Sequence, residues 1–273
     1  MISKDNTDKL IKIYFFISEN FHELQYYCER FSNNRNPDFT DQEIIAIYLY
    51  VMHHEGHTKI KHIHRFASEY LKDWFPKLGS YQAFNSRLNR LTGVFNKLVE
   101  LIVTENIPDD SIFDQSLLDS MPIITCSGKR FRKVAKEITD KGFNSTKGMY
   151  YFGIKLHVLG FRRKGKLPHP ESIVLTPASV NDITVYKQYW ASCYYNKTFF
   201  GDKIYIDYKL NDEIKEKLNS EMLTPIKYAK GTLDVIKTRM KAADELFSSA
   251  VSKIRQPIEA LFSWLIQKTD KPC

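Results

Sequence analysis

The chain has 273 residues and a mass of 32.0 kDa, and its 40 Lys and Arg residues against 32 Asp and Glu residues give a net charge of +8. Hydrophobic residues make up 43% and charged residues 26% of the sequence, which excludes a disordered or fibrous chain. No apolar run approaches the roughly 18–20 residues of a membrane span, and the four cysteines form no C-x-x-C pair. We therefore expect a cytoplasmic protein with no membrane partner, whose basic excess favours a polyanionic partner.

The first hundred residues predict helices. Residues 41–54 place apolar side chains at helical spacing, and Thr40 with Glu43 has the pattern of a capping box. Residues 64–75 continue the helical pattern until Pro76 ends it. Five histidines fall between His53 and His64, but HHEGH is not the H-E-x-x-H metal motif, so we expect solvated or core histidines there.

A further helix is expected over residues 81–102, with one apolar face and one basic face. The basic face carries Arg87 and Arg90, which are candidate DNA contacts. We expect residues 1–105 to form an all-helical module and residues 106–273 to form a second domain.

From about Pro108 the pattern changes to an α/β core. Strand-like runs occupy residues 111–123, 149–161 and 172–178. Between the first two runs lies a basic segment, residues 127–148, which we expect to be a loop. Helices are expected at 181–194 and 208–218, with short strands near 197–207 and 222–226. A long helix with an apolar stripe should run over residues 243–268. Alternating strands and helices predict a mixed sheet with helices around it.

Three acids lie where such a core could bring them together: Asp119 in LLDSMPI, Asp202 in FFGDKIY and Glu259 in RQPIEALF. Glu259 lies four residues after Arg255, so the two share a helix face. A carboxylate beside an apolar stripe is costly unless it is paired, caps a helix or binds a metal. Taken alone, Glu259 is better explained by a salt bridge with Arg255, and Asp202 by a turn position, than by a role in chemistry.

The phrases LLDSMPI, YYFGIKLHVL, LTPASVNDI, GDKIYIDY and SKIRQPIEALFSWL occur in the order found in bacterial insertion-sequence transposases of the DDE type. Over about residues 110–268 the chain most resembles the insertion sequence 982 type. The resemblance implies a ribonuclease-H-like catalytic core behind a helical module that binds the transposon end. It also implies that Asp119, Asp202 and Glu259 are the catalytic acids.

The resemblance further implies the cofactor and the partners. Two Mg²⁺ ions, or Mn²⁺, are expected on the three acids, with Asp119 bridging both, since carboxylates suit hard cations and two metals suit phosphoryl transfer. The DNA partners are the terminal inverted repeats of the element and the target DNA, and a homodimer is expected to hold two ends. Besides Arg87 and Arg90, the expected DNA contacts are Arg255, Lys268, Lys129, Arg130, Arg132 and Lys133.

Several alternatives remain open at this stage. Asp114 should face the opposite side of the strand from Asp119, and Asp207 should cap the following helix. Asn181 and Asp182 match the family's S-x-N-D phrase, and they could be either helix caps or catalytic groups.

The chain also departs from the family around the helix expected over residues 243–268. The family's usual Tyr and Lys there are replaced by Ser252 and Ile266, and relatives usually continue beyond the position of Cys273. Other functions to be weighed are therefore an inactive, truncated DNA-binding remnant and a metal-dependent nuclease without strand transfer.

Overall fold

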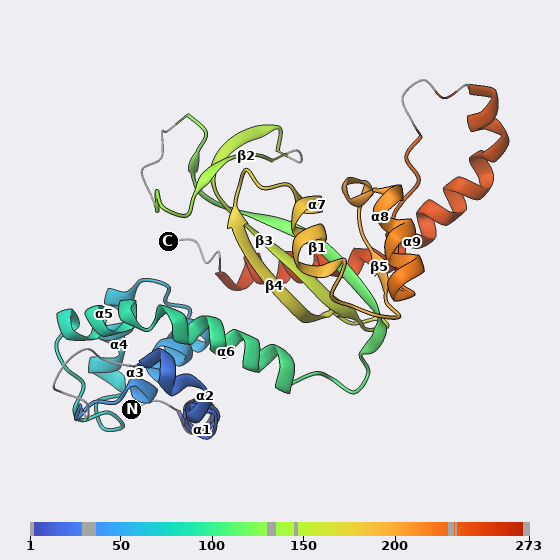
Figure 1. The fold of residues 1–273 in the computed structure, drawn as a ribbon. Coiled ribbons are helices and arrows are strands. Elements are labelled where there is room, and N and C mark those ends of the chain that lie inside the picture. The colour runs from blue at the N-terminus through green and yellow to red at the C-terminus, as the bar shows by residue number, and fades with distance from the viewer. Residues whose placement is uncertain are drawn as a thin grey trace. The chain divides into compact units, whose positions relative to one another are not determined.

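The computed structural model describes residues 3–28, 37–129, 135–144, 147–228, 232 and 234–269. The chain divides into two compact units (Figure 1). The helical unit contains residues 1–102 together with 265–273, and the sheet unit contains residues 103–264. None of the described helices combines the length and the apolar character needed to cross a membrane.

The helical unit contains the helices α1 (Lys4–Glu19), α2 (Phe21–Leu24), α3 (Asp41–Tyr50), α4 (Ile60–Tyr70), α5 (Tyr81–Arg90) and α6 (Thr92–Glu105). Thr40 and Glu43 form the predicted capping box at the start of α3. Buried aliphatic and aromatic side chains from these helices form one core, which includes Leu10, Ile44, Ile63, Leu88 and Leu98. Burial of apolar side chains from each of these helices thus holds the unit together.

Helix boundaries in this unit differ from the prediction at two places. A π-helical turn, Val51–Glu55, ends the predicted 41–54 helix, and Gly56 follows in the left-handed conformation. The helix predicted over 81–102 is two helices, because α5 ends at Arg90 and α6 begins at Thr92 after Leu91. The side chain of Thr92 donates to the carbonyl of Asn89, which is a local bond that competes with a continuous helix.

The sheet unit is built on a mixed sheet that has six strands in the described residues. They are β1 (Ile112–Ser127), β2 (Asp140–Asn144), β3 (Met149–Arg162), β4 (His169–Pro177), β5 (Thr198–Phe200) and β6 (Glu221–Leu223). The order is β2-β3-β1-β5-β6. β4 also pairs with β3, along the stretch of β3 that follows the one paired with β2. β1 is antiparallel to β3 but parallel to β5, and β5 is parallel to β6. The predicted fold class, helices followed by a mixed sheet with helices, is confirmed.

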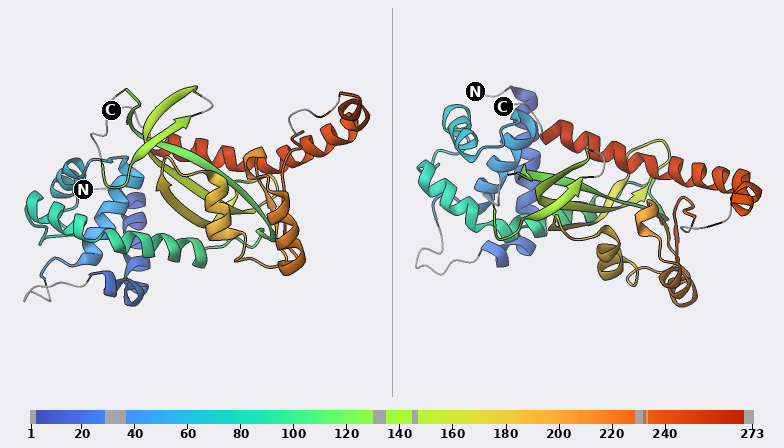
Figure 2. Two further views of the ribbon diagram at one scale, coloured as in Figure 1. Left: turned by 45° about the horizontal axis from the view of Figure 1, so that its top comes forward. Right: turned by 90° about the horizontal axis from the view of Figure 1, so that it is seen from above.

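Helices cover both faces of this sheet (Figure 2). On one face lie α7 (Asp182–Val185), the π-helical turn Tyr186–Trp190 and α8 (Tyr208–Leu218), whose core contacts include Leu118, Phe199 and Trp190. The long helix α9 (Asp234–Thr269) runs along the other face and buries Val251, Ile258 and Phe262. Because side chains alternate along a strand, neighbouring residues of β1 and β5 face α7 and α9 in turn.

Two predicted elements need correction. The segment 127–148, expected to be a loop, contains β2, which pairs with β3 from Asp140↔Gly153 to Asn144↔Met149. α9 begins at Asp234 rather than Ala243, and it continues through Pro257. A proline costs a helix one backbone hydrogen bond, and burial of the neighbouring Ile258 supplies an apolar contact that favours the uninterrupted helix.

Candidate active site

The register of β1 and β5 places two acids side by side. Leu117 of β1 is the parallel partner of Phe200 of β5, and Asp119 and Asp202 each lie two residues further along. Two residues is one full side-chain period of a strand, so this spacing directs both acids to the same face of the sheet. Asp202 lies just past β5, where its carboxylate caps a short 3₁₀ helix by accepting from the backbone N–H of Lys203 at 2.7 Å.

Arg255 links the third acid, Glu259, to Asp119. The guanidinium donates from Nη1 to Asp119 Oδ2 at 2.7 Å and from Nη2 to Glu259 Oε1. Arg255 and Glu259 are four residues apart on α9, so the helix presents both to the same place. Arg255 thereby joins a strand residue to a helix residue that are far apart in the sequence. The side chain of Arg255 is only 14% exposed, whereas that of Glu259 is 54% exposed.

Burial and the neighbouring charges change the pKa values of Asp119 and Arg255. Burial raises the pKa of Asp119 to about 6, Arg255 acts to lower it, and the charges of Glu259 and Asp182 add to the rise. Burial also acts to lower the pKa of Arg255, but the neighbouring carboxylates, Asp202 among them, together raise it above its ordinary value. A site that concentrates carboxylates around one cation is a typical functional arrangement.

A second network lies on the face of the sheet that carries α7. Asp182, at the start of α7, accepts from Lys155 Nζ at 3.1 Å, and its side chain is 13% exposed. His157 is fully buried on β3, where Nε2 lies 2.8 Å from Thr176 Oγ1 and Nδ1 lies 3.7 Å from Asp182 Oδ1. Asn181 stands at the N-cap position but its side chain makes no capping bond. Asp182 is therefore an ion-pair partner of Lys155.

Of the two competing acids, Asp207 has the helix-capping role that the sequence predicted. Asp207 caps α8 by accepting from the backbone N–H of Leu210 at 3.1 Å, and it pairs with Lys187 at 2.5 Å. Asp114 lies on β1 before Asp119, separated from it by an irregularity of the β1–β3 pairing, and is exposed. Neither acid makes a contact with Arg255 or Glu259 in the described hydrogen bonds.

Apart from Arg255, which pairs with Asp119 and Glu259, the predicted DNA contacts fall into three groups. Arg90, Lys129 and Lys268 are exposed. Arg87 is engaged inside the helical unit, because it donates to Asp41 Oδ1 at 2.5 Å and to the carbonyl of Phe39. Its side chain is only 15% exposed, so the structure favours a packing role for Arg87 over the predicted contact with DNA. Arg130, Arg132 and Lys133 lie outside the described residues.

The chemistry of Asp119, Asp202 and Glu259 suits a hard divalent cation, since each offers carboxylate oxygens. In the described part of the chain, no three His, Cys, Asp or Glu side chains are gathered closely enough to hold a metal ion. The positive charge between Asp119 and Glu259 is instead that of Arg255. A cation that bound both acids would take over this charge, and the side chain of Arg255 would have to turn away.

The model of the family "Transposase DDE domain" matches residues 113–270, which is more than half of the chain. The chain belongs to the DDE transposase family. DDE transposases are enzymes that cut and join DNA strands, they bind DNA, and they generally use divalent metal ions. The matched segment contains Asp119, Asp202 and Glu259.

The chain was also compared with curated protein sequences and with solved structures. No curated protein sequence matches the chain. The solved structure "Mos1 transposase paired-end complex with left transposon end" is 12% identical, with 85% of this DDE transposase and 80% of that chain covered. The TM-score is 0.25, and at that value the likeness carries no argument about fold or ligand.

The sequence predicts the three acids and the Arg255–Glu259 pair, but not the other contacts around these acids. The Asp119–Arg255 and Asp182–Lys155 pairs join distant parts of the chain, so no local spacing in the sequence predicts them. Only the Arg255–Glu259 pair has a local signal, the separation of four residues on a helix.

Proposed function

We propose that this DDE transposase cleaves the ends of an insertion sequence of the 982 type and joins them to target DNA, using Asp119, Asp202 and Glu259 to hold two Mg²⁺ or Mn²⁺ ions. The observation that supports the proposal is the placement of the three acids on neighbouring elements of the sheet unit. Asp119 and Asp202 follow paired residues of two parallel strands, and Arg255 links Asp119 to Glu259. One acid on a strand, one just after a strand and one on a helix would together offer the carboxylate oxygens that divalent cations bind.

Each residue has a distinct role in this proposal. Asp119 would bridge both ions, while Asp202 and Glu259 would each hold one. Two such ions stabilise the attacking and the leaving oxygens of an in-line displacement at phosphorus. Arg255, once its place between the acids is taken by a cation, would contact a DNA phosphate with its planar fork of donors.

The DNA partners in this proposal are the terminal inverted repeats of the element and the target duplex. Exposed basic residues on both units, Arg90, Lys129 and Lys268, would contact phosphates and make binding depend on salt. A homodimer would hold two element ends in one complex. The helical unit would bind the element end, and the sheet unit would carry the chemistry.

The test uses the purified chain and a labelled duplex that carries the sequences flanking its reading frame. With Mg²⁺ the wild type should nick this duplex and produce joined products, and Glu259→Gln should lower the rate at least about a hundredfold while it still binds DNA. Glu216→Gln, an exposed glutamate of α8, is the matched control and should cut normally. Equal cutting by wild type and Glu259→Gln would overturn the assignment of the site.

The same assay separates the other two functions. A nuclease without strand transfer would produce metal-dependent nicks and no joined product. An inactive remnant would bind the duplex and cut nothing with either metal.

A further inference from the structure

The β2–β3 hairpin has one packed face and one exposed face. Gly142 of β2 is buried, and a Cβ added there would lie 2.7 Å from the carbonyl oxygen of Ala178. Its cross-strand partner, Tyr151 of β3, is fully buried. The backbone of β2 therefore rests directly on the segment that follows β4, which fixes this face of the hairpin against the sheet unit.

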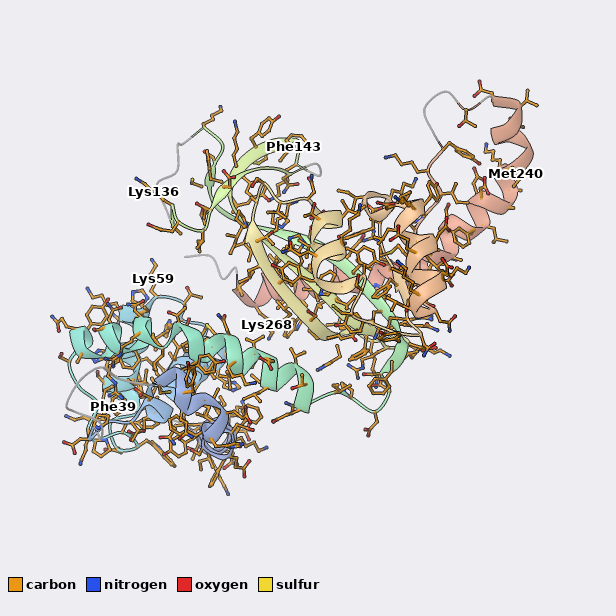
Figure 3. All side chains as sticks on the ribbon, in the orientation of Figure 1. Phe39, Lys59, Lys136, Phe143, Met240 and Lys268 are labelled. Carbon is orange, nitrogen blue, oxygen red and sulfur yellow. The ribbon has the colours of Figure 1, made fainter. Side chains whose placement is uncertain are left out.

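The opposite face carries two exposed aromatic rings. Phe143 and Tyr150 are direct cross-strand partners, with 53% and 58% of their surfaces exposed. Their ring centroids are 5.0 Å apart, and Lys141 Nζ lies 4.7 Å from the centroid of the Tyr150 ring. Figure 3 labels Phe143 on this hairpin. We call Lys141, Phe143 and Tyr150 the aromatic platform.

The surroundings of the platform are basic. Lys129, Lys136 and Lys147 are exposed on the adjoining segments of chain, where Glu137 and Asp140 are the described acids. Asp140 accepts from the backbone N–H of Lys141, so part of its charge is engaged locally. Aromatic faces beside lysines suit a ligand that is both flat and anionic.

We propose that the aromatic platform stacks the bases of unpaired DNA nucleotides. The proposal rests on the proposed function, since cutting a DNA end produces strands whose last nucleotides can leave the duplex. Inside a duplex the faces of a base are covered by its neighbours, so exposed rings can stack only on unpaired or unstacked nucleotides. The lysines would contact the phosphates of the same strand, whatever its sequence.

The test measures binding of the full chain to a fluorescein-labelled oligo(dT) strand and to a labelled duplex of equal length, by anisotropy. Phe143→Ala and Tyr150→Ala should each weaken oligo(dT) binding by roughly five- to one-hundredfold, the range measured for single base–aromatic stacks. Duplex binding should change less than about twofold, because the duplex contacts are mainly to phosphates. Phe143→Trp should retain oligo(dT) binding.

Tyr195→Ala removes an equally exposed aromatic ring outside the hairpin and is the matched control. Unchanged oligo(dT) affinity in both alanine variants would overturn the proposal. An equal loss on oligo(dT) and duplex, together with a lower melting temperature, would also overturn it, since the pair would then serve only to stabilise the hairpin. Glu259→Gln should bind oligo(dT) as the wild type does, so a failure of the metal site and a failure of the platform give different results.

Discussion

At the scale of single residues, Arg255 explains how two carboxylates of the site can lie on either side of one group without repelling each other. Asp119 and Glu259 each accept a hydrogen bond from the same guanidinium. Like charges at such separation disfavour ionisation, and a shared cation offsets this cost. Since a divalent cation would supply the same compensation, a metal bound as proposed would compete with Arg255 for the same two acids.

The competition leads to a prediction for Arg255→Gln. Without metal the variant should lose about 2 kcal/mol of stability, because two charge-assisted hydrogen bonds disappear and the acids repel. Addition of Ca²⁺ should then raise its melting temperature more than that of the wild type, since no guanidinium has to be displaced. Thermal unfolding with and without Ca²⁺ measures both effects.

Glu259→Gln is the control for this experiment, and Ca²⁺ should stabilise it least, because one anionic ligand is missing. An equal Ca²⁺-induced shift in wild type and Arg255→Gln would show that Arg255 does not oppose metal binding.

His157 leads to a prediction about acid stability. Burial lowers the pKa of His157 from 6.5 to about 4, with Asp182 acting in the opposite direction and Lys155 in the same one. Between these two pH values the unfolded chain binds a proton that the folded chain does not, so stability falls as pH falls through this window. Urea unfolding should show the wild type losing on the order of 2 kcal/mol more than His157→Gln between pH 7.5 and pH 5.

The matched control is His22→Gln, because His22 is exposed. It should lose stability in parallel with the wild type. If His157→Gln also follows the wild type, His157 is not the group whose burial opposes protonation.

At the scale of secondary structure, Lys197 and Glu171 tie together strands that are not neighbours in the sequence. Lys197 precedes β5 and pairs with Glu171 of β4 at 2.8 Å, and it also donates to the carbonyl of Phe113 on β1 at 2.7 Å. Ser116 of β1 donates to the other oxygen of Glu171 at 2.7 Å. This network fixes the position of β5 against β1, and therefore of Asp202 beside Asp119.

Lys197→Met should lower the free energy of unfolding by about 3–5 kcal/mol, because Glu171 is left as a buried, unpaired charge. The double variant Lys197→Met with Glu171→Gln should regain part of the loss, since the amide is neutral and still accepts from Ser116. Urea unfolding of both single variants and the double variant measures the coupling. Losses that simply add would contradict a direct interaction between the two side chains.

The elements of the sheet unit show what local patterns can and cannot predict. Alternating β-formers predicted β3, a short strand-like run predicted part of β1, and apolar periodicity predicted the buried half of α9. The first turns of α9 expose Val235 and Met240, so no apolar stripe marks them. β2 was missed because its charged flanks resemble a loop, whereas its strand conformation depends on pairing with β3.

The candidate site shows the same division. The positions of Asp119 in a strand and Asp202 after a strand follow from their flanking apolar residues, and the family resemblance selected both. Their adjacency depends on the Leu117↔Phe200 register, which is a long-range feature that a single sequence does not contain. Arg87 was expected to face DNA because it lies between apolar positions, but it forms an ion pair with the buried Asp41.

At the scale of the whole molecule, the proposed reaction requires two element ends and therefore two copies of the site. One chain presents one set of acids, Asp119, Asp202 and Glu259. Homo-oligomers are most often dimers with two-fold symmetry, and such a dimer would present two equivalent sites to two equivalent ends. Each chain would then cut one end.

Mixing wild-type chains with Glu259→Gln chains before DNA is added tests this arrangement. In an equal mixture about a quarter of randomly formed dimers contain two active chains, so joining of both ends should fall to about a quarter. The total number of cut ends should fall only to about half, since every active chain still cuts one end. Gel analysis of the cut ends and of the doubly joined product gives the two fractions. If both quantities fall to about half, a single chain performs both cuts, and the dimer is not required for catalysis.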